Sequence, residues 1–427
     1  MQTGKHKMTT GKKRKEFFKR LVFYLSIFIF FVFCCVKIVF AYFNNMGIDF
    51  TLFYSCTYAA MRGKDFFDVS NLVFHQWEEP LMVLPGLLIF YIPYMLLDIK
   101  SAHLLYFLLS LGASVFVYVW IFKLTGLLKK VDFRNPNLNA LLFVAGAFVF
   151  LNSSPQLMCQ RNGQVTIWVL LALLLFFTGS DKYRRTVWFG LSAVFKYSMI
   201  TFFAPLLFIK KQYFICFGAL TIFLIICAWP AFAGYNIIEL YVRYAEVIQN
   251  TINGGCNSFE LAGHDLLQFG FFRMSLLNLL GKAFFAITML WILWRERDKE
   301  GIGLNLMLLV FCFTMLVSYH RLYDNIIVVL LLLVKINFLI LRKDRFNSLI
   351  CGAFLTFYMI PVSWIFSLAD CLGGNPLLAR IFYTSPFEDF QTVLPIIAMS
   401  QTLLGLYLLY LYLKSEDEYT FPLKTKS

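Results

Sequence analysis

Charged residues are scarce in this chain of 427 residues, where Asp, Glu, Lys and Arg together fill 15% of the positions. Ordinary soluble domains carry about 25% charged residues, so this scarcity excludes a string of such domains. Hydrophobic residues fill 60% of the positions and aromatic residues 19%. The composition therefore indicates an all-α, polytopic membrane protein, and it excludes a disordered chain and a secreted disulfide scaffold.

Motifs for metals and for soluble nucleotides are also missing. The sequence has no His-Glu-x-x-His motif and no paired-cysteine motif, and Asp65 and Asp68 have the wrong spacing for an Asp-x-Asp site. It has no glycine-rich loop that could cradle a phosphate. We therefore expect no metal, no cofactor and no soluble nucleotide substrate.

The ten cysteines follow no disulfide spacing, and most fall inside apolar runs, where Cys acts as a small hydrophobic residue. Only Cys256 and Cys371 are expected to reach the far side of the membrane. The sequence leaves open whether these two form a disulfide.

Long apolar runs are what the chain does have. A transmembrane helix needs about 20 mostly apolar residues, and the sequence predicts about twelve spans, some of them short or broken. The first run follows a basic stretch but is too long for a signal peptide and includes Lys37, so we expect an uncleaved helix. The runs are 21–42, 81–97, 102–124, 139–152, 164–178, 186–209, 213–233, 275–294, 302–319, 325–341, 347–368 and 391–413.

The formal charge of +14 comes from short Lys and Arg clusters between these runs. Such clusters mark the cytoplasmic side, so we expect no nucleic-acid partner. The pattern predicts a basic cytoplasmic N-terminus at 1–20, a single membrane domain at 21–413 and a cytoplasmic tail at 414–427. The three long loops, at 44–80, 234–273 and 369–390, are then external.

Twelve simple crossings would place the Lys129-Lys130 and Lys182 to Arg185 clusters on the outer side, against this rule. The conflict disappears if 186–209 is a hairpin with Lys196 near its tip, and if 81–124 crosses an odd number of times. The prolines at 80, 85 and 93 favour such interrupted helices. In the same arrangement, the spacing of aromatic residues after Asp49 predicts a short amphipathic helix at the membrane interface.

A few isolated polar residues in this apolar chain are candidates for chemistry, because an ionisable group at membrane depth costs about 2.5–3.5 kcal/mol. Asp49 follows the first run, Arg161 and Gln164 form a polar break between two runs, and Lys196 interrupts a third. The segment from Ser318 to Asn325 is a dense polar tip between two helices.

Each candidate also has a structural interpretation. Asp49 could be a solvated loop acid, and Lys196 could extend its ammonium group to the nearer interface. The polar tip could be a turn held by an Arg321 to Asp324 ion pair. His264 and its neighbour Asp265 suggest a dyad, although such a pair in a long loop is more often structural.

One acid together with several cations and amides fits group transfer from a lipid phosphate. Cations hold the phosphate leaving group, and a carboxylate removes the proton of an incoming hydroxyl. A single base facing a sugar donor gives inversion at the anomeric carbon. Arg, Lys and His can neutralise the phosphate without a metal.

Four short elements resemble the membrane glycosyltransferases of the GT-C superfamily, and most closely glycosyltransferase family 87, whose members are polyprenol-phosphate-dependent and mannosyltransferase-like. Thr166 departs from the usual Asn of the second element, and Tyr319 from the usual Pro of the fourth. The four elements are Asp49 to Asp68, Gly163 to Thr166, Trp188 to Lys196, and Ser318 to Asp324.

The resemblance implies an inverting hexosyltransferase, most typically for mannose, that uses a polyprenyl-phosphate sugar and a glycolipid or glycan acceptor on the non-cytoplasmic face of a bacterial inner membrane. A flippase for lipid-linked oligosaccharides and a polysaccharide polymerase stay as alternatives. Asp49 is the expected general base. Donor-binding candidates are Lys196, His320, Arg321, Tyr323, Asp324, Arg161 and Gln164, and the acceptor or loop candidates are Tyr54, Asp68 and His264.

Overall fold

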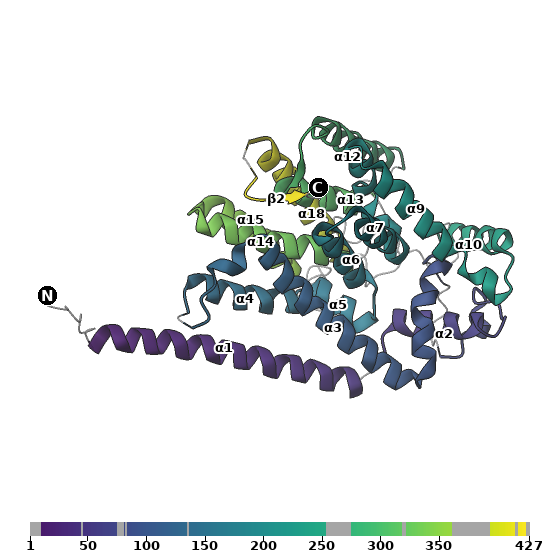
Figure 1. Cartoon of the computed structure of the whole chain (residues 1–427), viewed down its shortest axis with the longest axis horizontal. Coiled ribbons are helices and arrows are strands. Elements are labelled where there is room, and N and C mark those ends of the chain that lie inside the picture. Colours follow the sequence, from purple (N-terminus) through teal and green to yellow (C-terminus); the bar gives the residue numbers. More distant parts are fainter. Residues whose placement is uncertain are drawn as a thin grey trace, which may run out of the picture.

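A computed structural model shows that the chain is mostly helical, as its composition predicts (Figure 1). The structure describes residues 10–43, 46–74, 81, 83–134, 136–252, 275–317, 322–360, 393–414 and 417–423.

The helices of the N-terminal part, with 3-10 helices marked η, are α1 (Thr10–Phe43), α2 (Ile48–Ala60), η1 (Val69–Asn71), η2 (Pro85–Leu96), α3 (Ile99–Leu124), η3 (Leu127–Lys130), α4 (Leu138–Asn152), α5 (Ser154–Asn162), α6 (Thr166–Thr178) and α7 (Lys182–Lys196). The later elements are η4 (Tyr197–Ile200), α8 (Phe203–Ile209), α9 (Tyr213–Cys227), η5 (Trp229–Ala233), α10 (Ile237–Ile252), α12 (Ser275–Arg295), β1 (Gly301–Gly303), α13 (Leu304–Val317), η8 (Leu322–Asn325), α14 (Ile326–Leu341), α15 (Arg345–Met359), α18 (Val393–Lys414) and β2 (Thr420–Pro422).

Three helical segments among the described residues are long and apolar enough to cross a membrane, namely Glu16–Val39, Ile99–Leu124 and Tyr213–Ala233. The count rises to as many as five if each of two bent helix pairs forms one span. The chain is therefore a membrane protein, whereas the number of twelve spans stays a prediction. Helix α1 runs along one side of the bundle, and α2 and α10 lie at the end away from its N-terminus (Figure 1).

The apolar run at 81–97 does not form a regular α-helix. Pro85 begins η2 and Pro93 lies inside it, and proline removes a backbone donor wherever it occurs. Among the described residues of 81–124, α3 alone is long enough to cross the membrane. This agrees with the odd number of crossings that the charge pattern requires.

The short helix expected after Asp49 is present as α2, but the prediction that it is amphipathic was wrong. Eleven of its 13 residues are buried, including Asp49. Phe50 packs against aromatic rings of η2 and α3, with ring centroids 6.0 Å from Tyr91 and 5.3 Å from Tyr106. Since apolar residues surround α2 on nearly all sides, it packs as a core helix does.

The hairpin expected around Lys196 is confirmed. Helix α7 ends at Lys196, and the segments Lys182–Ile200 and Phe203–Ile209 are bent by 111°. Helices α7 and α9 are parallel neighbours, because Gly218 faces Thr186 and Gly190 faces Ile222. The chain must therefore turn back between them, and Lys196 lies at that turn.

The centre of the molecule consists of α13 and α14, which are apolar and buried on almost all sides. The predicted tail is not simply a polar extension, because Asp417 to Leu423 fold back onto the bundle. Strand β2 pairs antiparallel with β1, with Phe421 opposite Ile302. At Glu418 both carboxylate oxygens accept hydrogen bonds from buried Lys335 of α14, at 2.6 and 2.7 Å.

Candidate functional site

The start of α2 lies directly on the end of α5, and two glycines allow this contact. A Cβ on Gly47 would lie 2.5 Å from the carbonyl carbon of Asn162, and one on Gly163 would lie 2.5 Å from the Cβ of Phe50. Gly163 also has a φ of +74° and ends α5, in the left-handed region that favours glycine. The two glycines thus place Asp49, in the first turn of α2, beside the polar break after α5.

The polar break itself is held by hydrogen bonds to its backbone. The hydroxyl of Tyr106 donates to the Gln164 carbonyl at 2.9 Å, and the Trp168 indole N–H donates to that hydroxyl at 3.2 Å. Gln164 is buried, whereas Arg161 in the last turn of α5 is exposed. The break therefore presents an ordered backbone with one cation at its rim.

A buried ion pair lies next to this break. The Lys196 ammonium donates to both oxygens of Asp324, at 2.8 and 2.7 Å. Thr166, in the first turn of α6, donates its hydroxyl to the same carboxylate at 2.8 Å. The Asp324 side chain is fully buried and the Lys196 side chain is 15% exposed, so the carboxylate holds the ammonium group in place.

Asp49 and this ion pair both act on Cys159 of α5. The charges of Asp324, Lys196 and Asp49 all act on its thiol, so the three lie within electrostatic range of one point. Two carboxylates and one ammonium give this part of the site a formal charge of −1. A phosphate would need further cations there, and Arg161 at the rim is one.

Helix dipoles match the sign of each charge at the site. Asp49 lies in the first turn of α2 and Asp324 lies just before α14 begins, where the helix end is positive. Lys196 ends α7 and Arg161 lies in the last turn of α5, where the helix end is negative. Four helix ends therefore stabilise the charge arrangement of this region.

Two further side chains hold the backbone around the site in place, and neither was predicted from the sequence to be a site residue. His103 of α3 accepts a hydrogen bond at Nε2 from the Gly47 N–H, at 3.3 Å. Lys37, noticed only as a charge within the first run, donates to the Leu151 carbonyl at the bend between α4 and α5, at 2.5 Å, and to Gln160 at 3.2 Å. Polar residues inside long apolar runs were the available signal for both.

Two of the loop candidates have structural contacts. The Tyr54 hydroxyl donates to the Leu97 carbonyl at 2.9 Å, which joins α2 to the end of η2. Asp68 caps η1, where it accepts from the Ser70 N–H and hydroxyl at 3.0 and 2.7 Å. These bonds from Ser70 lower the pKa of Asp68.

The remaining predicted residues lie outside the described part of the chain. These are His264, His320, Arg321, Cys256 and Cys371, together with the side chain of Tyr323. The eight cysteines that the structure describes are free thiols. Within the described residues, no group of three or more His, Cys, Asp and Glu side chains gathers as metal ligands would.

The comparisons with known proteins identify one family. The model of glycosyltransferase family 87 matches residues 85–318, which is more than half of the chain. The matched range contains Arg161, Gln164, Thr166 and Lys196. No curated protein and no solved structure matches the chain.

Proposed function

Because this chain belongs to glycosyltransferase family 87, we propose that it transfers a hexose, with mannose as the first choice, from a polyprenyl-phosphate donor to a lipid-linked or glycan acceptor. Membership in this family makes the chain a glycosyltransferase, whereas the identities of its donor, sugar and acceptor are what we propose. The observation that supports it best is the buried ion pair between Lys196 and Asp324, which lies next to the contact that places Asp49 beside the polar break.

In the proposed reaction, an acceptor hydroxyl attacks the anomeric carbon of the donor sugar. The new bond joins the acceptor oxygen to that carbon, while the bond from the carbon to the phosphate oxygen breaks and its electron pair leaves with the lipid phosphate. The Asp49 carboxylate takes the hydroxyl proton. One displacement from the face opposite the leaving group inverts the anomeric configuration.

Positive charge for the leaving phosphate comes from the chain in this proposal, without a metal. Lys196 is the main candidate, since Asp324 and Thr166 fix the position of its ammonium group. Arg161 is exposed at the rim and can meet an anionic group there. His320 and Arg321 are proposed to add the remaining charge, and Tyr323 to shape the sugar pocket.

The site is proposed to face the non-cytoplasmic side of a bacterial inner membrane, with both termini in the cytoplasm. The basic clusters near Lys130 and Arg185 support this orientation, because they lie at the other ends of the helices that lead to Arg161 and Lys196.

Purified protein incubated with radiolabelled polyprenyl-phosphate mannose and membrane glycolipid tests the proposal. Label should appear covalently in the acceptor, and Asp49→Asn should abolish transfer while donor binding stays near the wild-type level. Asp181→Asn is the matched control, because Asp181 caps the far end of α7 and Asn caps equally well. Wild-type turnover by Asp49→Asn removes the proposed base, and label that only crosses a vesicle membrane supports a flippase instead.

A further inference from the structure

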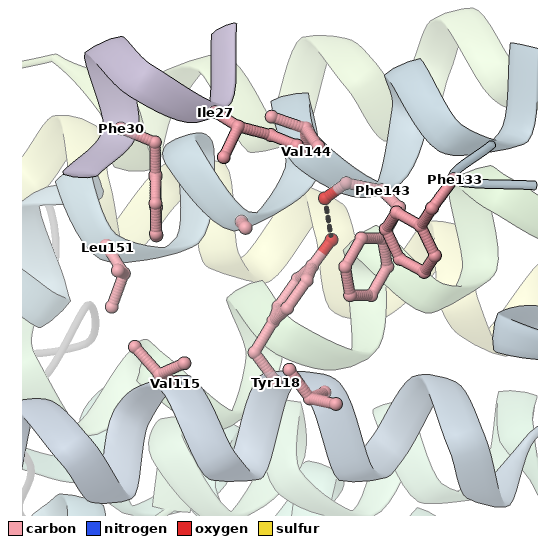
Figure 2. Close-up of a pocket in the computed structure, with 10 residues that line it drawn as sticks. Ile27, Phe30, Val115, Tyr118, Phe133, Phe143, Val144 and Leu151 are labelled. Atoms are coloured by element: carbon pink, nitrogen blue, oxygen red, sulfur yellow. Dashed lines mark hydrogen bonds between the residues drawn. The ribbon is translucent and has the colours of Figure 1, made fainter. Parts of the chain in front are cut away.

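An apolar cavity lies between α1, α3 and α4 (Figure 2). Its volume is about 160 Å³. Ile27 and Phe30 reach into it from α1, Val115 and Tyr118 from α3, and Phe143, Val144, Ala147 and Leu151 from α4.

Water is a poor occupant for this cavity. The one hydroxyl among the lining side chains belongs to Tyr118, and it donates to the Phe143 carbonyl at 2.8 Å. A bound water needs two to four polar partners, whereas apolar cavities of about 150 Å³ stay dry and accept apolar guests. Phe23 is the one buried residue of α1 within Glu16–Val39, so one wall of the cavity borders the lipid phase.

Three basic residues, which we call the basic rim, lie close in the chain to one residue that lines the cavity. Phe133 lines the cavity, and its carbonyl accepts from the Tyr24 hydroxyl of α1 at 3.4 Å. The exposed side chains of Lys129, Lys130 and Arg134 flank Phe133 in the chain. On α1, Lys19 and Arg20 precede Tyr24 by about one turn, and the carboxylates nearest to these basic residues in the chain are Asp132 and Glu16.

We propose that the cavity and its rim form a binding site for one anionic phospholipid. A segment of one acyl chain fills the cavity, and the headgroup phosphate binds Lys129, Lys130 and Arg134. Charge complementarity selects this occupant over a zwitterionic lipid, because basic pockets between transmembrane helices attract anionic headgroups. The site is separate from the proposed transfer reaction and does not depend on it.

Native mass spectrometry of the full-length, delipidated protein tests the proposal. The protein is titrated with phosphatidylglycerol and with phosphatidylcholine of identical acyl chains, and the wild type should bind phosphatidylglycerol more tightly. Replacing Lys129, Lys130 and Arg134 by Gln should weaken phosphatidylglycerol binding about fivefold per residue, from about 1 kcal/mol for each basic side chain. Phosphatidylcholine binding should stay unchanged.

A cavity-filling variant, Ala147→Phe, should lose both lipids, and Ala145→Phe on the exposed side of α4 is its control. Arg297→Gln with Lys343→Gln and Arg345→Gln removes three exposed charges elsewhere and should retain the preference. The variant that replaces Lys129, Lys130 and Arg134 by Gln changes only exposed side chains. It therefore tests the proposal even if Ala147→Phe fails to fold. Equal binding of the two lipids by the wild type overturns the proposal, as does displacement of phosphatidylglycerol by a tighter-binding polyprenyl phosphate.

Discussion

At the scale of single residues, the ion pair between Lys196 and Asp324 holds the end of α7 against the start of α14. Its carboxylate is fully buried and bonds to both the ammonium group and the Thr166 hydroxyl. The match of the two charges offsets a large desolvation cost, so loss of one partner leaves the other buried and uncompensated.

We expect Asp324→Asn to lower the free energy of unfolding by about 3 kcal/mol, because breaking a buried pair from one side costs about 3–5 kcal/mol. The measurement is thermal unfolding in detergent, together with transfer activity. The double variant Lys196→Met with Asp324→Leu should recover much of the stability but no activity. A double variant as unstable as the single one would show that packing, rather than charge, decides the effect.

The glycines at the contact of α2 with α5 allow a second prediction at this scale. Gly163→Ala combines a positive φ with a steric clash against Phe50, so it should destabilise by more than the roughly 1–2 kcal/mol of the left-handed conformation alone. Its effect is measured by thermal unfolding.

Two matched variants separate the two causes. Gly63 has a φ of +66°, but a Cβ added there would meet no atom within 4 Å, so Gly63→Ala should lose only the conformational part. Gly112 has ordinary helical backbone and open space, so Gly112→Ala should be neutral or stabilising. If Gly163→Ala lowers the stability no more than Gly63→Ala does, the clash with Phe50 adds nothing to the cost of the substitution.

Among the elements, the short C-terminal strand β2 is held more firmly than its length suggests. Phe421 is 1% exposed, Arg185 of α7 donates to the Leu423 carbonyl, and Lys335 binds Glu418. Asp417 accepts the Asn305 N–H at 2.6 Å, while burial raises the pKa of its carboxyl. The strand thus joins α7, α13 and α14 at one end of the bundle.

Phe421→Ala should lower the free energy of unfolding by about 3–5 kcal/mol, the usual cost of removing a buried Phe side chain. Pro422→Ala, at the exposed neighbouring position, should change it little. Limited proteolysis after Lys414 and thermal unfolding report the two effects. Equal stability of both variants would mean that the strand does not contribute to the fold.

Sequence patterns predicted the regular helices of the apolar runs, but they did not predict the burial of α2 or the tertiary contacts of single polar residues. The run at 102–124 became α3 and the run at 325–341 became α14, because continuous apolar stretches need helical backbone in a membrane. The burial of α2 was missed because it depends on rings from η2 and α3, which lie more than 30 residues away. The bonds of Thr166 and Glu418 likewise depend on tertiary contacts, which local periodicity does not contain.

At the scale of the whole molecule, the bent pair of α4 and α5 decides which groups share a side of the membrane. The two helices differ in direction by 50° and together meet the length and hydropathy needed for a span. Lys130 lies before this pair and Arg161 in its last turn, and both side chains are exposed. A single span therefore puts Lys130 and Arg161 on opposite sides.

Cysteine labelling in intact cells tests this arrangement. Arg161→Cys should react with a membrane-impermeant maleimide from outside, while Lys130→Cys should react only after permeabilisation, because basic clusters stay in the cytoplasm. The parent is an active variant in which the ten native cysteines are replaced by Ser or Ala. Labelling of both positions from one side would make α4 and α5 a re-entrant loop, and the reverse pattern would place Asp49 and Lys196 in the cytoplasm. Either result would separate the proposed site from an acceptor on the outer face, so this topology decides where transfer can occur.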